Sequence, residues 1–467
     1  MRKTRVLAAG VVATTLLISA GCGGSSGGGS GDGGSGGDDN TLTVWTTEDQ
    51  ADRVSAQQKI MDEFGSKAGV SVKLVAVGED QLTTVLTSAA AAKDLPDVIG
   101  ALSLNGVQQL ATDDLVDSDA ATEIINKLGT DTFVKRSLEL TSSDGQQLAV
   151  PSDAFTQLMF YRKDLFAAAG LPEPKTYGDI QKAAQELNKG KMAGIVAATS
   201  PADSFTQQTF EQVAVANNCQ LVDDAGNITL TSPQCQESFA FYADLMKDYS
   251  VPGNQDADTT RATYFAGDAA MVLWSSFLLD ELAGLRNDAL PTCDQCKDDP
   301  TWLAKNTGVV ATMQGPGGSA PTAFGEIVSW NVLKDASPKA KDLVTYMMSD
   351  GYPAWLAVSP EGKVPTRTGT ASNPKEYVDA WSKLETGVDK KELLSATYPG
   401  AVLSAVASSP ASFDRWGIPD QGQLAAAVAG QYVVPKALAK MINSGATAAE
   451  ATAEAQKAAE QIKADLG

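Results

Sequence analysis

The sequence predicts an α/β fold made of two domains or lobes. Beyond Asn40, segments that alternate apolar and polar residues take turns with segments whose apolar residues recur at helical spacing. This alternation is typical of α/β proteins with mainly parallel sheet. A chain of 467 residues is also too long for one compact core, and its 43% apolar content is near the globular average. Most of the chain should therefore fold, around more than one core.

The first predicted strand is 41–45, "TLTVW", in which Leu42 and Val44 share one face. A polar run follows it, so Trp45 is either core packing or a flat platform for a ligand. Glu48 and Asp49 are either caps of the next helix or acceptors in a site. The following elements are expected in this order: a helix over 52–64, a strand over 70–77, a helix over 81–92, a strand over 96–100 and a terminal helix over 446–466.

The segment 175–190 carries the most complete helix signal. Thr176 is a candidate N-cap, with Asp179 three residues later, and Gly190 is expected to end the helix. Its apolar stripe consists of Ile180, Ala183, Ala184 and Leu187.

The N-terminus has the pattern of an export signal rather than of a folded element. A basic start, "MRKTR", precedes an apolar run over 6–20, which is shorter than the ~20 residues of a membrane-spanning helix. The next residues, "ISAGCGG", resemble a bacterial lipoprotein lipobox, in which Cys22 would be lipidated; Ser19 departs from the usual Leu. The alternative is an ordinary signal peptide with an incidental cysteine. Residues 1–21 are thus the expected signal, and 22–40, rich in Gly and Ser, a flexible tether.

Four further cysteines in an exported chain suggest disulfides. The expected pairs are Cys219 with Cys235 and Cys293 with Cys296. The "CDQC" segment is alternatively a redox motif or half a metal site, and the crossed pairing is also open.

Charge and composition exclude several functions. The formal net charge is −21, which disfavours nucleic acid and anionic membrane surfaces as partners. The chain has no histidine, so Ser-His-Asp and Cys-His nucleophile systems and HExxH zinc sites are excluded. We expect no cofactor and no metal.

A series of short motifs along the chain carries a family resemblance. The segment "AVPSDAFTQLMFYRKDLFAAAGLPEPKTYGDIQKAAQEL" resembles the "VP…D…YYNKDLF…AGL..PKTW" pattern of the maltose-binding-like solute-binding proteins of ABC importers. "TLTVW", "LPDVIGA", "YFAGDAAMVLWSSFLL", "AFGEIVSWNVLKDASPKAKDLVTYMMSD" and "GKVPTRTGT" resemble further family segments in the same order. Each motif is weak alone, but their joint order covers essentially all of 41–467.

The resemblance implies a two-lobe fold of the periplasmic-binding-protein-like II kind, with the chain crossing between the lobes at hinges. It places lobe one at 41–151 plus 327–365, and lobe two at 152–326 plus 366–467. It also implies a monomeric, non-enzymatic receptor on the outer face of the cytoplasmic membrane, held by its lipid anchor. Such a receptor captures a sugar or oligosaccharide between the lobes and delivers it to the permease subunits.

Sugar chemistry then selects candidate residues. Buried hydroxyls need acceptors and donors, and the C–H faces need flat aromatic platforms. For each candidate, the alternative to ligand binding is a structural position: in the core, between the lobes or in a solvated loop. The expected ligand-binding residues are Trp45, Glu48, Asp49, Asp153, Phe155, Trp274, Trp330, Asn331, Arg367 and Trp416.

Two other functions stay open on the residues alone. A polyamine receptor would also use Trp and Asp, so the ligand class is not decided. An exported glycosidase would need only a pair of carboxylates, which the many Asp and Glu residues do not exclude.

Overall fold

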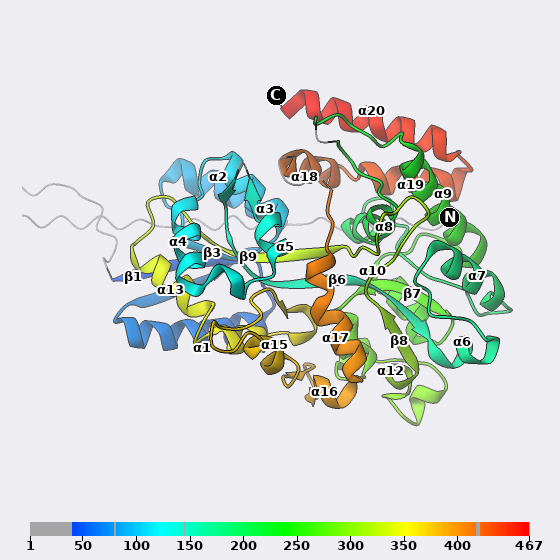
Figure 1. Ribbon diagram of the computed structural model, residues 1–467, viewed down its shortest axis with the longest axis horizontal. Coiled ribbons are helices and arrows are strands. Elements are labelled where there is room, and N and C mark those ends of the chain that lie inside the picture. The colour runs from blue at the N-terminus through cyan, green and yellow to red at the C-terminus, as the bar shows by residue number, and fades with distance from the viewer. Residues whose placement is uncertain (1–39, 79–80, 144, 224, 417–420, 467) are drawn as a thin grey trace, which may run out of the picture. The chain divides into compact units, whose positions relative to one another are not determined.

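One long strand, β6 (Val150–Arg162), connects two halves of the fold (Figure 1). Residues 150–156 pair with β9 (Gly325–Val332) and β10 (Val364–Pro365), whereas residues 157–162 pair with β7 (Met271–Ser275) and β8 (Thr307–Val310). The computed structural model describes residues 40–78, 81–143, 145–223, 225–416 and 421–466. The lipidation site predicted at Cys22 lies outside these residues.

The sheet order is β10-β6-β9-β3-β1-β2, with β7 and β8 attached to β6. β1 (Thr41–Thr46) pairs in parallel with β2 (Ser71–Ala76) and β3 (Val98–Leu102). All other pairs among these described strands are antiparallel. The expectation of a mainly parallel sheet is therefore wrong, because β6 and β9 run in opposite directions through the middle of the fold.

Helices cover both halves. Those near β1–β3 are α1 (Ala51–Ala68), α2 (Leu82–Ala92), α3 (Leu104–Thr112), α4 (Ser118–Leu128), α5 (Lys135–Leu140), α13 (Lys339–Met347) and α14 (Tyr352–Leu356). Those near β7 and β8 are α6 (Lys163–Ala169), α7 (Tyr177–Leu187), α8 (Ser204–Ala216), α9 (Pro233–Tyr249), α10 (Ala257–Phe265), α11 (Leu278–Leu282) and α12 (Trp302–Asn306). The helices α15 (Glu376–Trp381), α16 (Leu394–Thr397) and α17 (Gly400–Ser408) follow β10.

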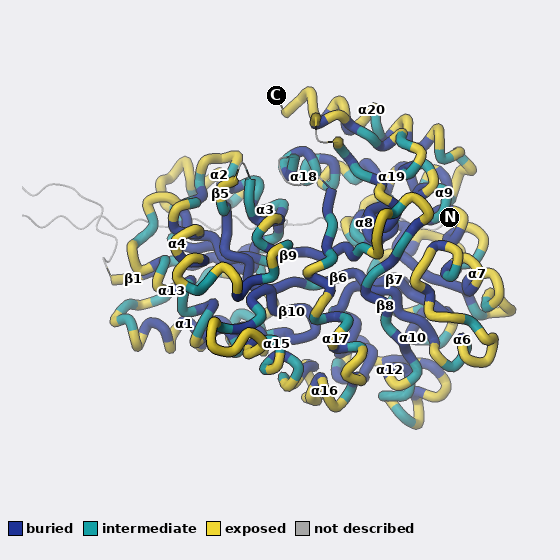
Figure 2. Tube along the Cα trace, viewed as in Figure 1, coloured by how far each residue is buried: buried dark blue, intermediate teal, exposed yellow. Residues whose placement is uncertain are grey.

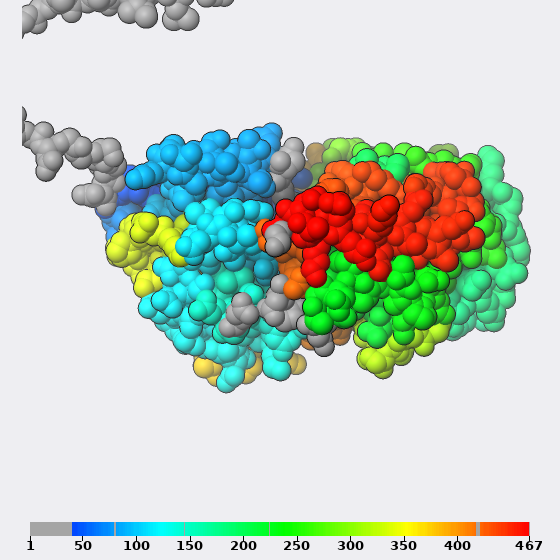
Figure 3. Space-filling model, turned by 90° about the horizontal axis from the view of Figure 1, so that it is seen from above, coloured from blue at the N-terminus to red at the C-terminus, as the bar shows by residue number. Residues whose placement is uncertain are grey.

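The chain ends in three helices, α18 (Gly422–Gly430), α19 (Val433–Ser444) and α20 (Ala448–Leu466). They pack on α8 and α9, and in Figure 3 this red and orange segment lies beside the green one. α18 also contacts α3, which belongs to the other half. Two short hairpins complete the described structure, β4 (Ser142–Ser143) with β5 (Gln146–Gln147) and β11 (Glu385–Thr386) with β12 (Glu392–Leu393).

The structure contains the helix cap and the disulfide pairs that the sequence predicts. Thr176 and Asp179 form a capping box at the start of α7, although this helix ends at Leu187, before Gly190. The disulfides join Cys219 to Cys235 and Cys293 to Cys296, the pairs expected from the sequence. Figure 2 shows that β6 is buried along its length, and only Phe155 among its residues is partly exposed. The middle of the fold is thus buried, with the ring of Phe155 as its partly exposed side chain in β6.

Candidate ligand-binding cleft

A cleft of two adjoining chambers lies along the β6–β9 pair. The first chamber measures about 180 Å³ and the second about 550 Å³. They share Ser103, Gln208 and Glu326 in their walls. The first is also lined by Thr47, Glu48, Arg53, Ala101, Asp153, Phe155, Phe277, Val328, Gly362 and Lys363. The second is also lined by Asn105, Ser204, Gln207, Glu211, Phe324, Arg415, Trp416, Ala425, Ala426, Ala429, Gly430 and Tyr432.

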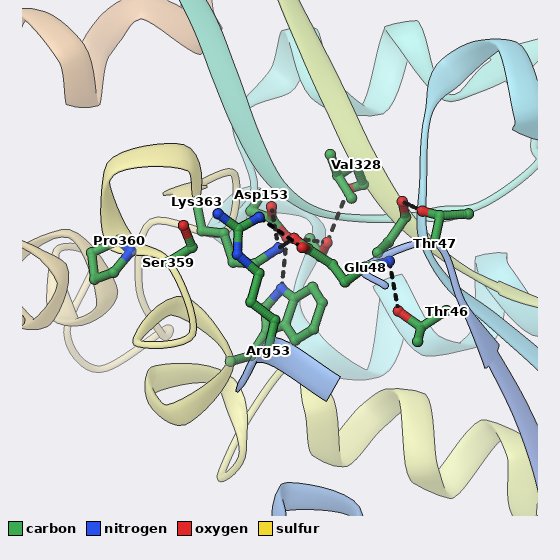
Figure 4. Close-up of polar contacts among 12 residues, drawn as sticks. Thr46, Thr47, Glu48, Arg53, Asp153, Val328, Ser359, Pro360 and Lys363 are labelled. Atoms are coloured by element: carbon green, nitrogen blue, oxygen red, sulfur yellow. Dashed lines mark hydrogen bonds and ion pairs between the residues drawn. The ribbon is translucent and has the colours of Figure 1, made fainter. Parts of the chain in front are cut away.

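Lys363 organises the charges of the first chamber (Figure 4). Its Nζ lies 2.7 Å from Glu48 Oε1 and 3.5 Å from Asp153 Oδ2, and it also sits 4.0 Å from the ring centroid of Trp355. Arg53 Nη1 donates to Glu48 Oε2 at 2.8 Å. Each cation is thus already matched to a carboxylate of the protein.

A bulge in β6 helps to place Asp153. The β6–β9 register shifts between Pro151 and Asp153, which leaves Ser152 as the extra residue. Asp153 Oδ1 accepts from the indole Nε1 of Trp355 at 2.6 Å and from Ser152 Oγ at 2.6 Å. These neutral donors and Lys363 hold a carboxylate that is fully buried.

The two acids of this chamber respond differently to their surroundings. Burial would raise the pKa of Glu48, but the charges of Lys363 and Arg53 outweigh it and lower the pKa to about 2. Burial raises the pKa of Asp153, only partly opposed by Lys363 and by the hydrogen bonds from Ser152 and Trp355.

Aromatic rings form one wall of the first chamber. The ring centroids of Phe155 and Phe277 lie 5.5 Å apart, and the guanidinium of Arg53 lies 5.3 Å from that of Phe277. Gly362 is required beside this wall, because a Cβ there would lie 1.9 Å from the Phe277 ring. The partly exposed face of Phe155 offers an apolar platform to a ligand.

Arg415 organises the second chamber in the same way. It contacts Glu211 Oε1 at 3.2 Å through Nε and Glu326 Oε2 at 2.7 Å through Nη1. Glu211 also accepts from the backbone N–H of Trp416 at 2.9 Å, and Glu326 from that of Leu104 at 2.8 Å. Burial raises the pKa of Glu211, although Arg415 acts in the opposite direction.

Four of the residues predicted from the sequence line this cleft. Glu48, Asp153 and Phe155 belong to the first chamber and Trp416 to the second. Glu48 is not a helix cap, since Gln50 occupies the N-cap position of α1 and Glu48 binds two cations. Trp416 is nevertheless mostly buried, and its Nε1 donates to Cys219 O at 2.7 Å.

The other six predicted residues lie outside the two chambers as the described residues form them. Trp45, a residue of β1, packs with Val77, Leu82 and Ile99 in a hydrophobic core cluster. Asp49 is exposed next to Glu48. Trp274, at the end of β7, is covered by Phe205, whose ring centroid lies 5.2 Å away, and its Nε1 donates to Ala257 O.

Trp330, Asn331 and Arg367 are buried in the half that contains β1–β3. The Trp330 ring lies against Gly100, where a Cβ would lie 2.1 Å from it, and 4.9 Å from the Trp355 ring. Asn331 Nδ2 donates to Ile99 O at 3.4 Å. The Arg367 guanidinium donates to the carbonyl oxygens of Met348 and Leu128 and to Thr132 Oγ1, so it ties chain segments together.

Sequence reasoning missed most of the polar residues of the cleft. Lys363 lies within the quoted "GKVPTRTGT", and Arg415 directly precedes the candidate Trp416, so the sequence had already drawn attention to both segments. Arg53, Gln207, Gln208, Glu211 and Glu326 carry no local signal, because they sit within regular helices or strands.

The described residues contain no group of three or more Cys, Asp or Glu side chains arranged to hold a metal ion. Among them there is also no helix with the length and apolar character of a membrane span.

Comparisons with known proteins agree with this architecture. The family model described as bacterial extracellular solute-binding protein matches residues 47–354, more than half of the chain. The Escherichia coli (strain K12) protein named as an ABC transporter periplasmic-binding protein, YcjN, is 27% identical over 326 residues, which is 68% of this chain and 70% of that protein.

Solved structures show the same fold at lower identity. A solute-binding protein of Thermotoga lettingae TMO, bound with α-D-tagatose, has a TM-score of 0.67 at 19% identity and covers 91% of this chain and 99% of that chain. Maltose-bound MalE3 of T. maritima has a TM-score of 0.66 at 18% identity and covers 90% and 100%. The two-lobe fold predicted from the sequence is confirmed. The chain therefore belongs to the bacterial extracellular solute-binding protein family and is an ABC-transporter solute-binding protein, a receptor rather than an enzyme.

Proposed function

We propose that this receptor captures an uncharged sugar or oligosaccharide in the two chambers and delivers it to the transmembrane subunits of an ABC importer. The observation that carries the proposal is the pairing of every cation in the chamber walls: Lys363 and Arg53 with Glu48 or Asp153, and Arg415 with Glu211 and Glu326. A phosphate or carboxylate ligand would have to break these pairs. A neutral polyhydroxy ligand needs only hydrogen bonds and an apolar platform.

The ligand would lie between Phe155 and the polar edges of both chambers. Glu48 would accept from its hydroxyls in the first chamber, where the buried Asp153 would hold Lys363 in place, and Trp416 would border the ligand in the second. Closure of the two lobes on each other would bury the ligand.

A cationic ligand such as a polyamine is the second candidate. The walls hold four carboxylates, Glu48, Asp153, Glu211 and Glu326, against three cations, Arg53, Lys363 and Arg415. The one excess negative charge would favour an amine. Each of the four carboxylates, however, already lies next to a cation of the protein.

Thermal-shift screening of the purified protein tests these alternatives. The panel is maltose, maltotetraose, α-D-tagatose, ribitol, glucose 6-phosphate and spermidine. We expect at least one uncharged compound to raise the melting temperature by mass action, and the sugar phosphate to have no effect. A shift with spermidine alone would contradict the ligand class, and hydrolysis of an oligosaccharide would contradict the receptor role.

We also propose that Cys22 carries a lipid and that residues 22–40 tether the receptor to the outer face of the membrane. The supporting signal is the small-residue lead into Cys22 after the apolar run. Fractionation of cells that express Cys22→Ala should move the protein from the membrane to the soluble fraction. Retention of the variant in the membrane would contradict the anchor.

A further inference from the structure

Helix α8 turns a polar face toward the second chamber. Ser204, Gln207 and Glu211 stand at helical spacing on that face, with Gln208 beside them, and all four line the chamber. Two of them already have partners in the protein. Glu211 pairs with Arg415, and Gln208 Oε1 accepts from Gln157 Nε2 at 3.4 Å.

Gln207 is the buried member of this chamber-lining face whose amide makes no hydrogen bond with any described residue. The residue is 6% exposed, and its Oε1 is buried without a partner. Buried polar groups in native proteins are almost always satisfied, so an exception of this kind calls for an explanation. Residues 417–420 lie outside the described residues.

Gln212 on the same helix shows what a structural glutamine does here. Its Oε1 accepts from the backbone N–H of Phe324, and its Nε2 donates to Thr322 O at 3.5 Å. Gln212 therefore ties α8 to the segment that leads into β9. Gln207 is also buried, but its amide connects no two segments of the chain. The amide therefore makes no hydrogen bond that stabilises the fold.

We propose that Gln207 is a ligand-binding and specificity-determining residue, which hydrogen-bonds a hydroxyl of an uncharged ligand in the second chamber. An amide both donates and accepts, as a hydroxyl does, so a half-turn of this amide, whose Oε1 is buried here, lets it pair with one ligand hydroxyl in either sense. The charges next to it are already matched, since Arg415 lies between Glu211 and Glu326. An anionic group placed beside Gln207 would face two carboxylates and no free cation. This inference rests on the proposed function.

The substitution Gln207→Met tests the role, because it keeps the length and helix propensity of the side chain and removes the amide. Maltose, α-D-tagatose and ribitol are titrated by calorimetry into the wild-type protein, Gln207→Met and the control Gln181→Met, which changes an exposed glutamine on α7. For the compound that binds the wild type, we expect Kd to rise about threefold to tenfold in Gln207→Met and to stay unchanged in Gln181→Met.

The melting temperature of the ligand-free protein separates a binding role from a structural one. We expect Gln207→Met to melt at the wild-type temperature or a few degrees above it, because a buried unpaired amide is removed. Gln212→Met should melt lower, since it leaves the Phe324 N–H and the Thr322 carbonyl unpaired.

The outcomes separate this inference from the proposed function. If a sugar or polyol binds the wild type and both variants equally, Gln207 does not contact the ligand, while the receptor role stands. A lower melting temperature for Gln207→Met, comparable to that of Gln212→Met, would assign the residue to the fold and overturn the inference. If none of the three compounds binds the wild type and spermidine does, the proposed ligand class and this inference fail together.

Discussion

The two chambers of the cleft use the same charge motif with different surroundings. In each, one cation stands between two carboxylates, Lys363 between Glu48 and Asp153 and Arg415 between Glu211 and Glu326. In the first chamber a second cation, Arg53, also binds Glu48, and the pKa of Glu48 falls to about 2. In the second, one cation serves both acids, and burial raises the pKa of Glu211.

Nearby cations therefore act together with burial: Glu48, with two cations, has a lowered pKa, whereas Asp153 and Glu211, with one cation each, have raised pKa values. In the first chamber every charged side chain of the wall is paired either with another wall residue or, for Glu326, with Arg415. The second chamber retains an unpaired amide, and that capacity is available to a ligand.

The largest effect is expected for Arg415→Met. It leaves Glu211 and Glu326 buried with only backbone donors, so the free energy of unfolding should fall by about 4–5 kcal/mol. Urea denaturation at pH 7 measures the loss. A triple variant that adds Glu211→Gln and Glu326→Gln should recover much of it, and a failure to recover would show that packing on Phe324, not charge, is the cause.

Lys363→Met should destabilise less, by about 3 kcal/mol. Glu48 keeps Arg53, and Asp153 keeps the donors from Trp355 and Ser152. The same denaturation series compares the two variants directly. A loss larger than that of Arg415→Met would reverse the comparison between the chambers.

Acid should act on the first chamber through Glu48. Its pKa is lowered in the folded state, from 4.5 to about 2, so the folded protein binds this proton less readily than the unfolded chain. The resulting stabilisation of about 2–3 kcal/mol is present above pH 4.5 and is lost as the pH falls toward 2.

The free energy of unfolding is measured from pH 2 to pH 7 for the wild type and for Glu48→Gln. This comparison checks whether stability is lost in acid. The variant should be less stable than the wild type at pH 7, and the difference should vanish near pH 2. Glu211→Gln serves as the matched comparison, because the raised pKa of Glu211 gives no such loss in acid. Parallel profiles for wild type and Glu48→Gln would contradict the assigned charge pairs.

The smallest effect on stability is expected for Phe155→Ala. Its ring is partly exposed in the first chamber, so unfolding should change by less than about 1 kcal/mol, while the Kd for a bound sugar rises by up to about tenfold. Calorimetric titration measures the effect on sugar binding, and thermal melting measures the effect on stability. A large drop in melting temperature with unchanged Kd would place Phe155 in the core.

Local structure was predictable to a considerable extent. The strand at 41–45, the helix starting near Thr176 and the terminal helix depend on periodicity and capping within a few residues, and the structure contains all three. The site was less predictable. Trp274 and Trp330 have the same local appearance as a cleft aromatic, but Phe205 and Trp355, distant in sequence, cover them.

The sequence by itself determined the order of elements, the family resemblance, the exclusion of histidine chemistry and the cysteines that pair. Only the tertiary structure decided which acidic and aromatic residues face the cleft. The deciding contacts join residues far apart in the chain: Asp153 and Lys363 are separated by 210 positions, and Glu211 and Arg415 by 204. A local pattern reports the polarity of a residue and its helix or strand face, whereas its partners and burial depend on which distant segments the fold brings against it.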